Sequence, residues 1–221
     1  MKNIPNDKRS MEFGSAFAID DANTLKVLDE PLDLNCLKDD EIINDFLYRY
    51  DSWIKSSNLN KFIGLDDFKY RCYSLGTSEA FDKFYLKNAK RRFRCFKGEY
   101  MYHKLSWRDR FEWDWLEDKP LQSNDAVVIS LPFADTGNEH TDFKQVMNEC
   151  CEMGVPVLVD CAYFGICREI EFDLSYDCIT DVTFSLSKTF PVAYARIGMR
   201  CTRIDDDDSM FVHNKVSYNN K

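Results

Sequence analysis

The chain has 221 residues, of which 44% are hydrophobic, and its formal net charge at pH 7 is −9. A chain of this length can bury a substantial apolar core in one domain or slightly more. The negative charge argues against nucleic acid or an anionic membrane as the main partner. No stretch approaches the roughly 20 apolar residues that a membrane helix needs, so we expect a soluble, cytoplasmic protein without a membrane partner.

The cysteines and acidic residues give no sign of a metal site. Nine cysteines are scattered along the sequence and none forms a Cys-x-x-Cys pair, which predicts reduced thiols and argues against structural zinc. The acidic run at residues 205–208 is expected to be a solvated loop, because consecutive carboxylates cannot all turn toward one ion. The sequence therefore predicts no bound metal.

The first half of the chain combines a polar lead-in with mixed elements. Residues 1–38 predict an N-terminal arm or irregular lead-in, and the domain is expected to begin at residue 39. Apolar residues at helical spacing between residues 39 and 56 predict an amphipathic helix. Ser78 is placed to cap a further helix. Residues 91–96 alternate charged and aromatic side chains, as is typical of a half-exposed strand.

The second half alternates apolar strands with a helical segment. The predicted strands cover residues 125–133, 155–163, 181–185 and 196–202, and the predicted helix covers residues 140–153 and ends at Gly154. This pattern indicates an α/β fold with three layers, α/β/α, around a mainly parallel mixed sheet. In such sheets the ligand crevice lies beyond the carboxyl ends of the strands, which is where the candidate polar residues fall.

An acidic and an aromatic residue close the second of these strands, which reads Asp160-Cys-Ala-Tyr163. A carboxylate after Val-Leu-Val is costly to bury unless it meets a cation or a hydrogen-bond donor. A protonated pyridine nitrogen would be such a partner, and Tyr163 could donate to a phenolic oxygen on the same ring. The alternative is structural, with Asp160 capping the next turn and Tyr163 in the core.

The tripeptide Gly76-Thr77-Ser78 precedes a predicted helix. Backbone N–H groups and hydroxyls at the positive end of a helix are suited to a phosphate. Taken alone, however, the tripeptide is an ordinary helix N-cap.

The run Ser185-Leu-Ser187-Lys188 follows the third predicted strand, and Arg196 comes eight residues after the lysine. The lysine is followed by Thr-Phe-Pro, which predicts a sharp turn. Burial in such a turn lowers a lysine's pKa and favours the neutral amine that condensation with an aldehyde requires. The Arg196 guanidinium offers a fork of donors to a dianionic phosphate.

In this order, the motifs resemble the large domain of fold-type I pyridoxal-phosphate enzymes, specifically the class I/II aminotransferases. The resemblance covers about residues 73–200. It implies that Lys188 carries pyridoxal 5'-phosphate as a Schiff base, that Asp160 binds its pyridine nitrogen and that Tyr163 contacts its ring hydroxyl. The remaining cofactor-binding residues that it implies are Gly76, Thr77, Ser78, Ser185, Ser187 and Arg196. It also implies a homodimer acting on amino acid and 2-oxo acid substrates.

Several positions depart from the family pattern. The family turn Asn-Pro-x-Gly reads Ala134-Asp-Thr-Gly137 here, so its asparagine is missing unless Asp135 or Asn138 replaces it. The aromatic residue that stacks on the cofactor ring is expected to be Tyr100, with Tyr102 and His103 as other candidates. Three tryptophans are expected to be core or interface anchors instead: Trp107, Trp113 and Trp115.

The chain ends at Lys221, soon after the lysine motif, whereas the family continues into a C-terminal small domain. That domain supplies the arginine that grips the substrate carboxylate. We therefore expect residues 39–221 to form a partial cofactor-binding large domain, with the small domain absent.

The leading hypothesis is an aminotransferase-like enzyme that passes an amino group from an amino acid to a 2-oxo acid. Two alternatives stay open. One is a lyase or decarboxylase that uses the same cofactor, since the retained residues do not separate these reactions. The other is a catalytically silent remnant that serves as a binding module.

Overall fold

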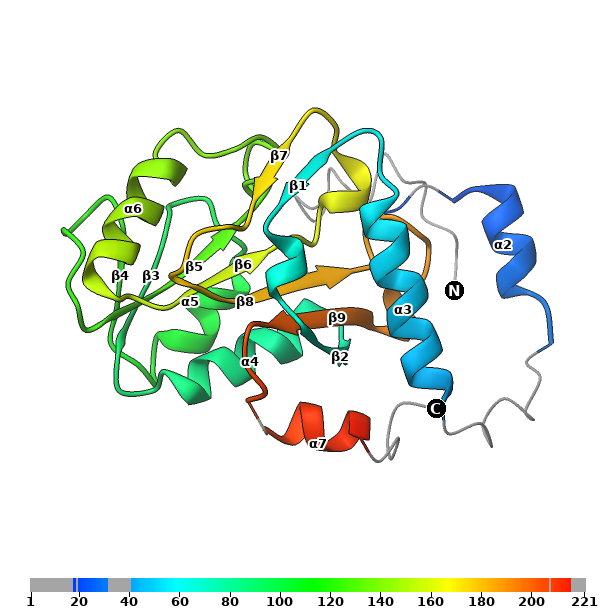
Figure 1. Ribbon diagram of the computed structural model, residues 1–221. Helices are drawn as coiled ribbons and strands as arrows, with labels where there is room; N and C mark the ends of the chain where they lie inside the picture. The colour runs from blue at the N-terminus through cyan, green and yellow to red at the C-terminus, as the bar shows by residue number, and fades with distance from the viewer. Residues whose placement is uncertain (1–17, 19, 32–40, 207, 216–221) are drawn as a thin grey trace.

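The structure, a computed structural model, describes residues 18, 20–31, 41–206 and 208–215. A seven-stranded sheet forms its centre, with helices on both sides (Figure 1). In spatial order the strands are β2 (Tyr70–Leu75), β9 (Ile197–Thr202), β8 (Ile179–Ser185), β6 (Val157–Asp160), β5 (Asp125–Ser130), β3 (Arg92–Cys95) and β4 (Trp113–Trp115). β9 runs opposite to the other six strands, so its pairs with β2 and β8 are antiparallel and all other pairs are parallel. The predicted mainly parallel mixed sheet is confirmed.

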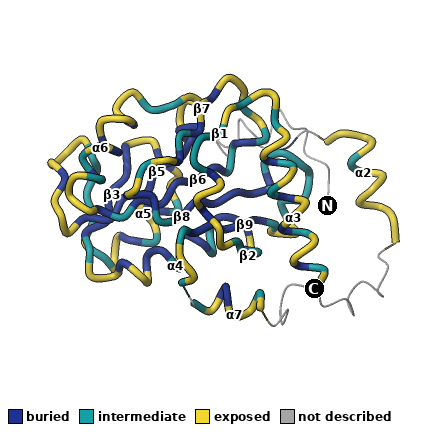
Figure 2. The backbone as a smooth tube through the Cα atoms, viewed as in Figure 1, coloured by how far each residue is buried: buried dark blue, intermediate teal, exposed yellow. Residues whose placement is uncertain are grey.

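Two apolar clusters on opposite faces of the sheet explain the three layers. Along β5, Val127 and Ile129 belong to one cluster, whereas Ala126 and Val128 belong to the other. This is the alternation of a strand that is covered on both faces. The covering helices are α3 (Ile42–Lys55) and α6 (Phe143–Met153) on the first face, and α4 (Thr77–Lys87) and α5 (Tyr102–Trp107) on the second. Figure 2 shows the strands as the buried interior of the molecule.

The smaller elements lie around this sheet. They are the strand pair β1 (Lys61–Ile63) and β7 (Glu171–Asp173), the helices α2 (Ala22–Leu28) and α7 (Ser209–Lys215), and the 3-10 turns η2 (Leu65–Asp67), η3 (Phe164–Ile166) and η4 (Ala193–Ala195). Of the predicted arm, residues 1–17, 19 and 32–38 lie outside the described residues. Across the described ranges, no helix is long and apolar enough to cross a membrane.

Most predicted elements of the domain are confirmed, within a few residues at their ends. The helix predicted at residues 140–153 is α6, and Gly154 ends it in the left-handed conformation at φ 64°. The predicted cap of the second helix is wrong by two residues. Gly76 is the N-cap of α4 and Ser78 is already inside the helix, because Gly76 adopts φ 70°, which a residue with a side chain rarely does.

The prediction of a half-exposed strand at residues 91–96 is also wrong, because all four residues of β3 are buried. Arg92 Nε donates to Asp125 Oδ1 at 2.7 Å, and Arg94 Nη1 donates to Asp125 Oδ2 at 2.7 Å. One buried carboxylate from the neighbouring strand β5 thus compensates two guanidinium groups, which allows their burial.

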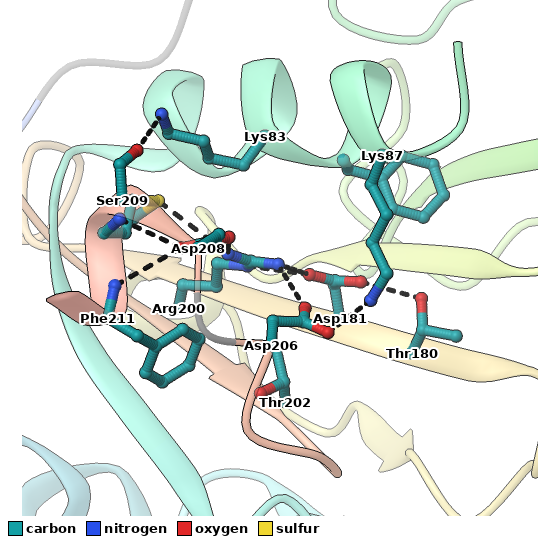
Figure 3. A network of polar contacts seen from close by, with 12 residues as sticks. Lys83, Lys87, Thr180, Asp181, Arg200, Thr202, Asp206, Asp208, Ser209 and Phe211 are labelled. Atoms are coloured by element: carbon teal, nitrogen blue, oxygen red, sulfur yellow. Dashed lines mark hydrogen bonds and ion pairs between the residues drawn. The ribbon is translucent and has the colours of Figure 1, made fainter.

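The acidic run at residues 205–208 is not simply a solvated loop, which corrects the sequence-based expectation. Arg200, whose side chain is fully buried, donates to Asp206 at 2.8 Å and to Asp181 at 2.7 Å, and it also pairs with Asp208 (Figure 3). Asp206 and Asp208 therefore turn toward a strand cation. Asp208 also accepts hydrogen bonds from the N–H groups of Met210 and Phe211 at the start of α7. Within the described ranges, no group of three or more His, Cys, Asp or Glu side chains is arranged for a metal ion.

Candidate functional site

A cavity of about 360 Å³ opens where β5, β6 and β8 end. Every residue that the sequence predicts for the cofactor site lines it, with the exception of Gly76. The volume falls within the range of small-molecule pockets, roughly 300–1,000 Å³. A larger groove of about 670 Å³ between α3, β2 and α7 contains none of the predicted residues. The smaller cavity is therefore the candidate active site.

Lys188 lies in a tight turn directly after β8, where the N–H groups of Thr189 and Phe190 both donate to the Leu186 carbonyl. Its side chain is only partly exposed, and its Nζ lies 5.9 Å from the centre of the Tyr163 ring. Burial lowers the pKa of the Lys188 ammonium group; Asp160 opposes this shift and Arg196 adds to it. The turn thus presents an amine that loses its proton more readily than an exposed lysine.

Asp160 is the last residue of β6 and is only 5% exposed. Its Oδ1 accepts a hydrogen bond from the Ala162 N–H at 3.0 Å, so it does cap the following turn, as the structural alternative proposes. It also lines the cavity. Burial, and next the nearby Glu99 carboxyl, raise the pKa of Asp160 to about 8, against the opposing effects of the Ala162 N–H and Lys188. A carboxyl of this kind gains most from a cation that enters the cavity.

Tyr163 sits at the entry of η3, three residues after Asp160, and lines the same cavity. The residue is of intermediate burial, unlike the fully buried aromatic residues of the core. The predicted neighbourhood of Lys188, Asp160 and Tyr163 is therefore present.

Arg196 and the start of α4 meet at one end of the cavity. Arg196 Nη2 lies 3.3 Å from Ser78 Oγ and 3.4 Å from the Leu75 carbonyl oxygen, and donates to both. A Cβ placed on Gly76 would come within 2.6 Å of Arg196 Nη2, so the guanidinium occupies space that glycine leaves open. Thr77 and Ser78 form the first turn of the helix. A cation, hydroxyls and helix N–H groups together suit a phosphate.

The two serines of the lysine motif differ in their contacts. Ser185 Oγ donates to the Ile197 carbonyl at 3.4 Å and accepts from the Ser187 N–H at 3.1 Å. Ser187 Oγ is buried, lines the cavity and has no hydrogen-bond partner. A buried hydroxyl without a partner is costly, so a ligand oxygen at this point would satisfy it.

The turn after β5 bears on the missing family asparagine. Ala134 and Asp135 line the cavity, whereas Asn138 does not. Of the two replacements considered, Asp135 is the one that the fold brings to the site.

The expected ring-stacking residue Tyr100 also lines the cavity and is 48% exposed. The other two candidates do not line it. Tyr102 donates its hydroxyl to Asp82 at 2.9 Å, and the fully buried His103 shares a hydrogen bond with the Tyr85 hydroxyl at 2.6 Å. Trp107 is buried in the second apolar cluster, and Trp113 and Trp115 pack against that cluster, in agreement with the expected core role.

Two cavity residues with polar side chains were not predicted from the sequence: Glu99 and Ser130. Glu99 is 8% exposed and accepts hydrogen bonds from the N–H and the hydroxyl of Ser130. Burial raises the pKa of Glu99 to about 7, although the Ser130 bonds act in the opposite direction. The sequence shows only that a charged residue, Glu99, directly precedes the candidate stacking residue Tyr100. That position does not indicate a role in the site until the structure shows Ser130 beside Glu99.

Neither the known protein families nor the curated proteins contain a match to this sequence. Solved structures do match. An L-threonine-O-3-phosphate decarboxylase from Porphyromonas gingivalis superposes with a TM-score of 0.58 at 14% identity, covering 92% of this chain and 63% of that one. An aromatic aminotransferase from Pyrococcus horikoshii gives 0.52 at 15% identity, with coverage of 80% and 59%. A PLP-bound C-S lyase from Staphylococcus hominis gives 0.52 at 11% identity, with coverage of 79% and 58%.

The chain thus spans about three fifths of the length of each of these proteins. At such low identity the likeness establishes the fold alone. The order and direction of the strands, the cavity at their carboxyl ends and these superpositions together show that the chain has the fold of the pyridoxal-phosphate-dependent aminotransferases and related fold-type I enzymes.

Proposed function

We propose that this chain binds pyridoxal 5'-phosphate through Lys188 and passes an amino group from an amino acid to a 2-oxo acid. One observation carries the proposal. Asp160 ends β6, Lys188 follows β8 and Arg196 directly precedes β9, yet all three line a single cavity. An amine, a buried carboxyl and a guanidinium in this arrangement match the aldehyde, the ring nitrogen and the phosphate of this cofactor.

The residues of the cavity fit the cofactor in two further respects. The unpartnered Ser187 hydroxyl lies in the cavity, where a phosphate oxygen would accept its hydrogen bond. Asp160 has a raised pKa in a buried setting, and a pyridinium N–H would supply the cation that favours its charged form.

The proposed division of roles follows from these positions. Arg196 and the start of α4 would hold the phosphate, and Asp160 would hold the ring nitrogen. Tyr163 would donate to the ring hydroxyl, and the exposed ring of Tyr100 would cover the cofactor face. The hydroxyls that would complete the phosphate site belong to Thr77, Ser78, Ser185 and Ser187.

When bound, the cofactor supplies an electron sink for the bonds at the substrate α-carbon. The chain's own contribution is proton transfer and charge placement. Lys188, with its lowered pKa, would take the proton from the substrate α-carbon and deliver it to the C4′ carbon of the cofactor. Asp160 would keep a negative charge at the ring nitrogen throughout, which maintains the electron demand.

We further propose a homodimer in the cytoplasm. Exposed large side chains support the dimer. Tyr100 and Met101 line the cavity and are 48% and 67% exposed, and Tyr194, which follows the lining residue Ala193, is 87% exposed. Exposed apolar groups that gather at one place are typical of interaction surfaces. Sedimentation of the purified protein would give twice the mass of one chain; a single-chain mass at micromolar concentration would contradict the dimer.

A lyase or decarboxylase is the second candidate function. It is supported by the similarity to a C-S lyase and to a decarboxylase, which is of the same order as the similarity to an aminotransferase. The residues that hold the cofactor do not distinguish these reactions, because the choice of bond depends on how the substrate is oriented.

Two experiments test the proposal in sequence. Addition of pyridoxal phosphate to the purified protein should produce a new absorbance band that Lys188→Ala abolishes. The control variant Lys144→Ala, on the exposed side of α6, should keep the band. Loaded protein is then incubated with amino acids, with and without 2-oxo acids. A new amino acid in the presence of an oxo acid supports transamination, whereas release of ammonia, sulfide or carbon dioxide supports the second candidate. Binding without turnover would favour the silent remnant.

A further inference from the structure

We propose that Glu99 is a positioning residue for Asp160: fixed to Ser130, its carboxyl places a second acid in the cofactor cavity and sets the charge that Asp160 carries. The inference rests on the proposed function, in which Asp160 faces a cationic ring nitrogen. It goes beyond that function because it gives the site a two-carboxyl unit in place of one.

The geometry of three adjacent strands creates this unit. Glu99 follows β3, and its N–H donates to the Phe96 carbonyl at 3.2 Å, which turns the chain back toward the sheet. Glu99 Oε1 accepts from the Ser130 N–H at 2.7 Å, and Oε2 forms a second bond with Ser130 Oγ. Ser130 on β5 is in turn the register partner of Asp160 on β6. A carboxyl held at both oxygens by Ser130 therefore lies next to the strand position that bears Asp160.

Burial makes the two acids interdependent. Glu99 is 8% exposed and Asp160 is 5% exposed, and both line the same cavity. Two carboxyls in a weakly polar setting do not both ionise readily, since each negative charge raises the cost of the other. The first proton is therefore lost by the two carboxyls as a coupled pair. Loss of the second proton becomes favourable when a cation enters the cavity.

Several titratable groups face the pair from the surrounding elements. They are Tyr85 on α4, Cys95 on β3, Glu117 after β4, Cys161 after β6 and Lys188 after β8. Lys188 is the cation of this set, and its charge acts on Asp160. Burial raises the pKa values of the Tyr85 hydroxyl and of both thiols, which keeps these three groups neutral over the pH range in which the carboxyls titrate.

The first test uses the protein without cofactor. Carboxyl carbon NMR would follow Asp160 from pH 5 to pH 9 in the wild-type protein, in Glu99→Gln and in the control Glu152→Gln, which removes an exposed charge on α6. The amide of Glu99→Gln keeps an oxygen for the Ser130 N–H but carries no charge. The titration midpoint of Asp160 should fall by about one pH unit in Glu99→Gln and stay in place in Glu152→Gln. An unchanged midpoint in Glu99→Gln would overturn the proposal.

Two further measurements cover the case in which Glu99→Gln fails to fold. In the wild-type protein the Asp160 signal should titrate in two steps, with one step at the midpoint of Glu99. In Ser130→Ala, Glu99 loses a hydrogen bond to its charged form and stays neutral to higher pH, so the Asp160 midpoint should again fall. A single wild-type step together with an unmoved midpoint in Ser130→Ala would refute the coupling.

The second test measures pyridoxal phosphate affinity in the wild-type protein and in Glu99→Gln. The ratio of the dissociation constants, wild type over variant, should be near one at pH 6, where both acids are protonated before binding. It should fall as the pH rises to 9, because the Glu99 charge then adds to the attraction for the ring nitrogen. A constant ratio would indicate a purely structural role and contradict the proposal. Absence of cofactor binding would refute the proposed function, while the NMR titration would still decide whether Glu99 acts on Asp160.

Discussion

Replacing Asp160 by Asn should stabilise the cofactor-free protein, and more so as the pH rises. Burial raises the pKa of this group from 3.8 to about 8, so the folded state resists the ionisation that the unfolded chain undergoes near pH 4. Below pH 4 Asp160 is protonated in both the folded and the unfolded state, so it does not lower the free energy of unfolding. Between pH 4 and pH 8 the wild-type protein loses about 1.4 kcal/mol per pH unit relative to the variant. At pH 7 the difference reaches about 4 kcal/mol.

The assay is urea unfolding of both proteins under reducing conditions at pH 4.5 and at pH 7. The Asn side chain keeps an oxygen for the Ala162 N–H, so the comparison isolates the charge. Asp142→Asn is the control, because Asp142 is exposed and makes no side-chain hydrogen bond to the end of α6. Its unfolding curve should move with pH as that of the wild-type protein does. If the free energies of unfolding of Asp160→Asn and the wild-type protein differ by the same amount at both pH values, burial does not oppose the ionisation of Asp160. That result would refute the raised pKa of this carboxyl.

Three other substitutions test the remaining parts of the account. Arg196→Ala should weaken pyridoxal phosphate binding at least tenfold and leave pyridoxal binding nearly unchanged, since the guanidinium contacts only the phosphate. Fluorescence titration with both compounds measures this, and equal losses of affinity for both would contradict it. Gly76→Ala should also weaken phosphate binding, because its Cβ would lie 2.6 Å from Arg196 Nη2 at φ 70°; wild-type affinity would refute the close approach. Asp125→Ala should lower the free energy of unfolding by about 3–5 kcal/mol in urea, because it leaves the Arg92 and Arg94 charges buried without their carboxylate; a loss below about 1 kcal/mol would show that the pairing is not needed.

The strands that carry the site were predictable because their signals are local. Apolar runs that end in Asp160 and Ser185 specify both a buried strand and the polar group at its carboxyl end. Parallel strand order then brings these groups together at one edge of the sheet. The site residues could therefore be placed near one another before the structure was known.

Two of the wrong predictions share one physical cause, which is pairing between distant charges. Arg92 and Arg94 read as exposed residues until Asp125, some thirty positions later in the sequence, is seen to neutralise them. The acidic run reads as solvated until Arg200 is seen to draw Asp206 inward. From the sequence pattern, a charged residue is predicted to be exposed because burying a charge is costly. The pattern does not reveal the distant partner that would compensate this cost. Glu99 was missed for a related reason, since only the fold brings it to the distant hydrogen-bond donors of Ser130.

Covalent trapping would show whether Lys188 is the amine that holds the cofactor. Protein loaded with pyridoxal phosphate is reduced with borohydride, digested with trypsin and analysed by mass spectrometry. If Lys188 holds the cofactor, the cofactor mass appears on a peptide of residues 169–196, because trypsin no longer cleaves at a modified Lys188. Cofactor mass on surface lysines, with cleavage at Lys188 as in the untreated protein, would refute this role of Lys188.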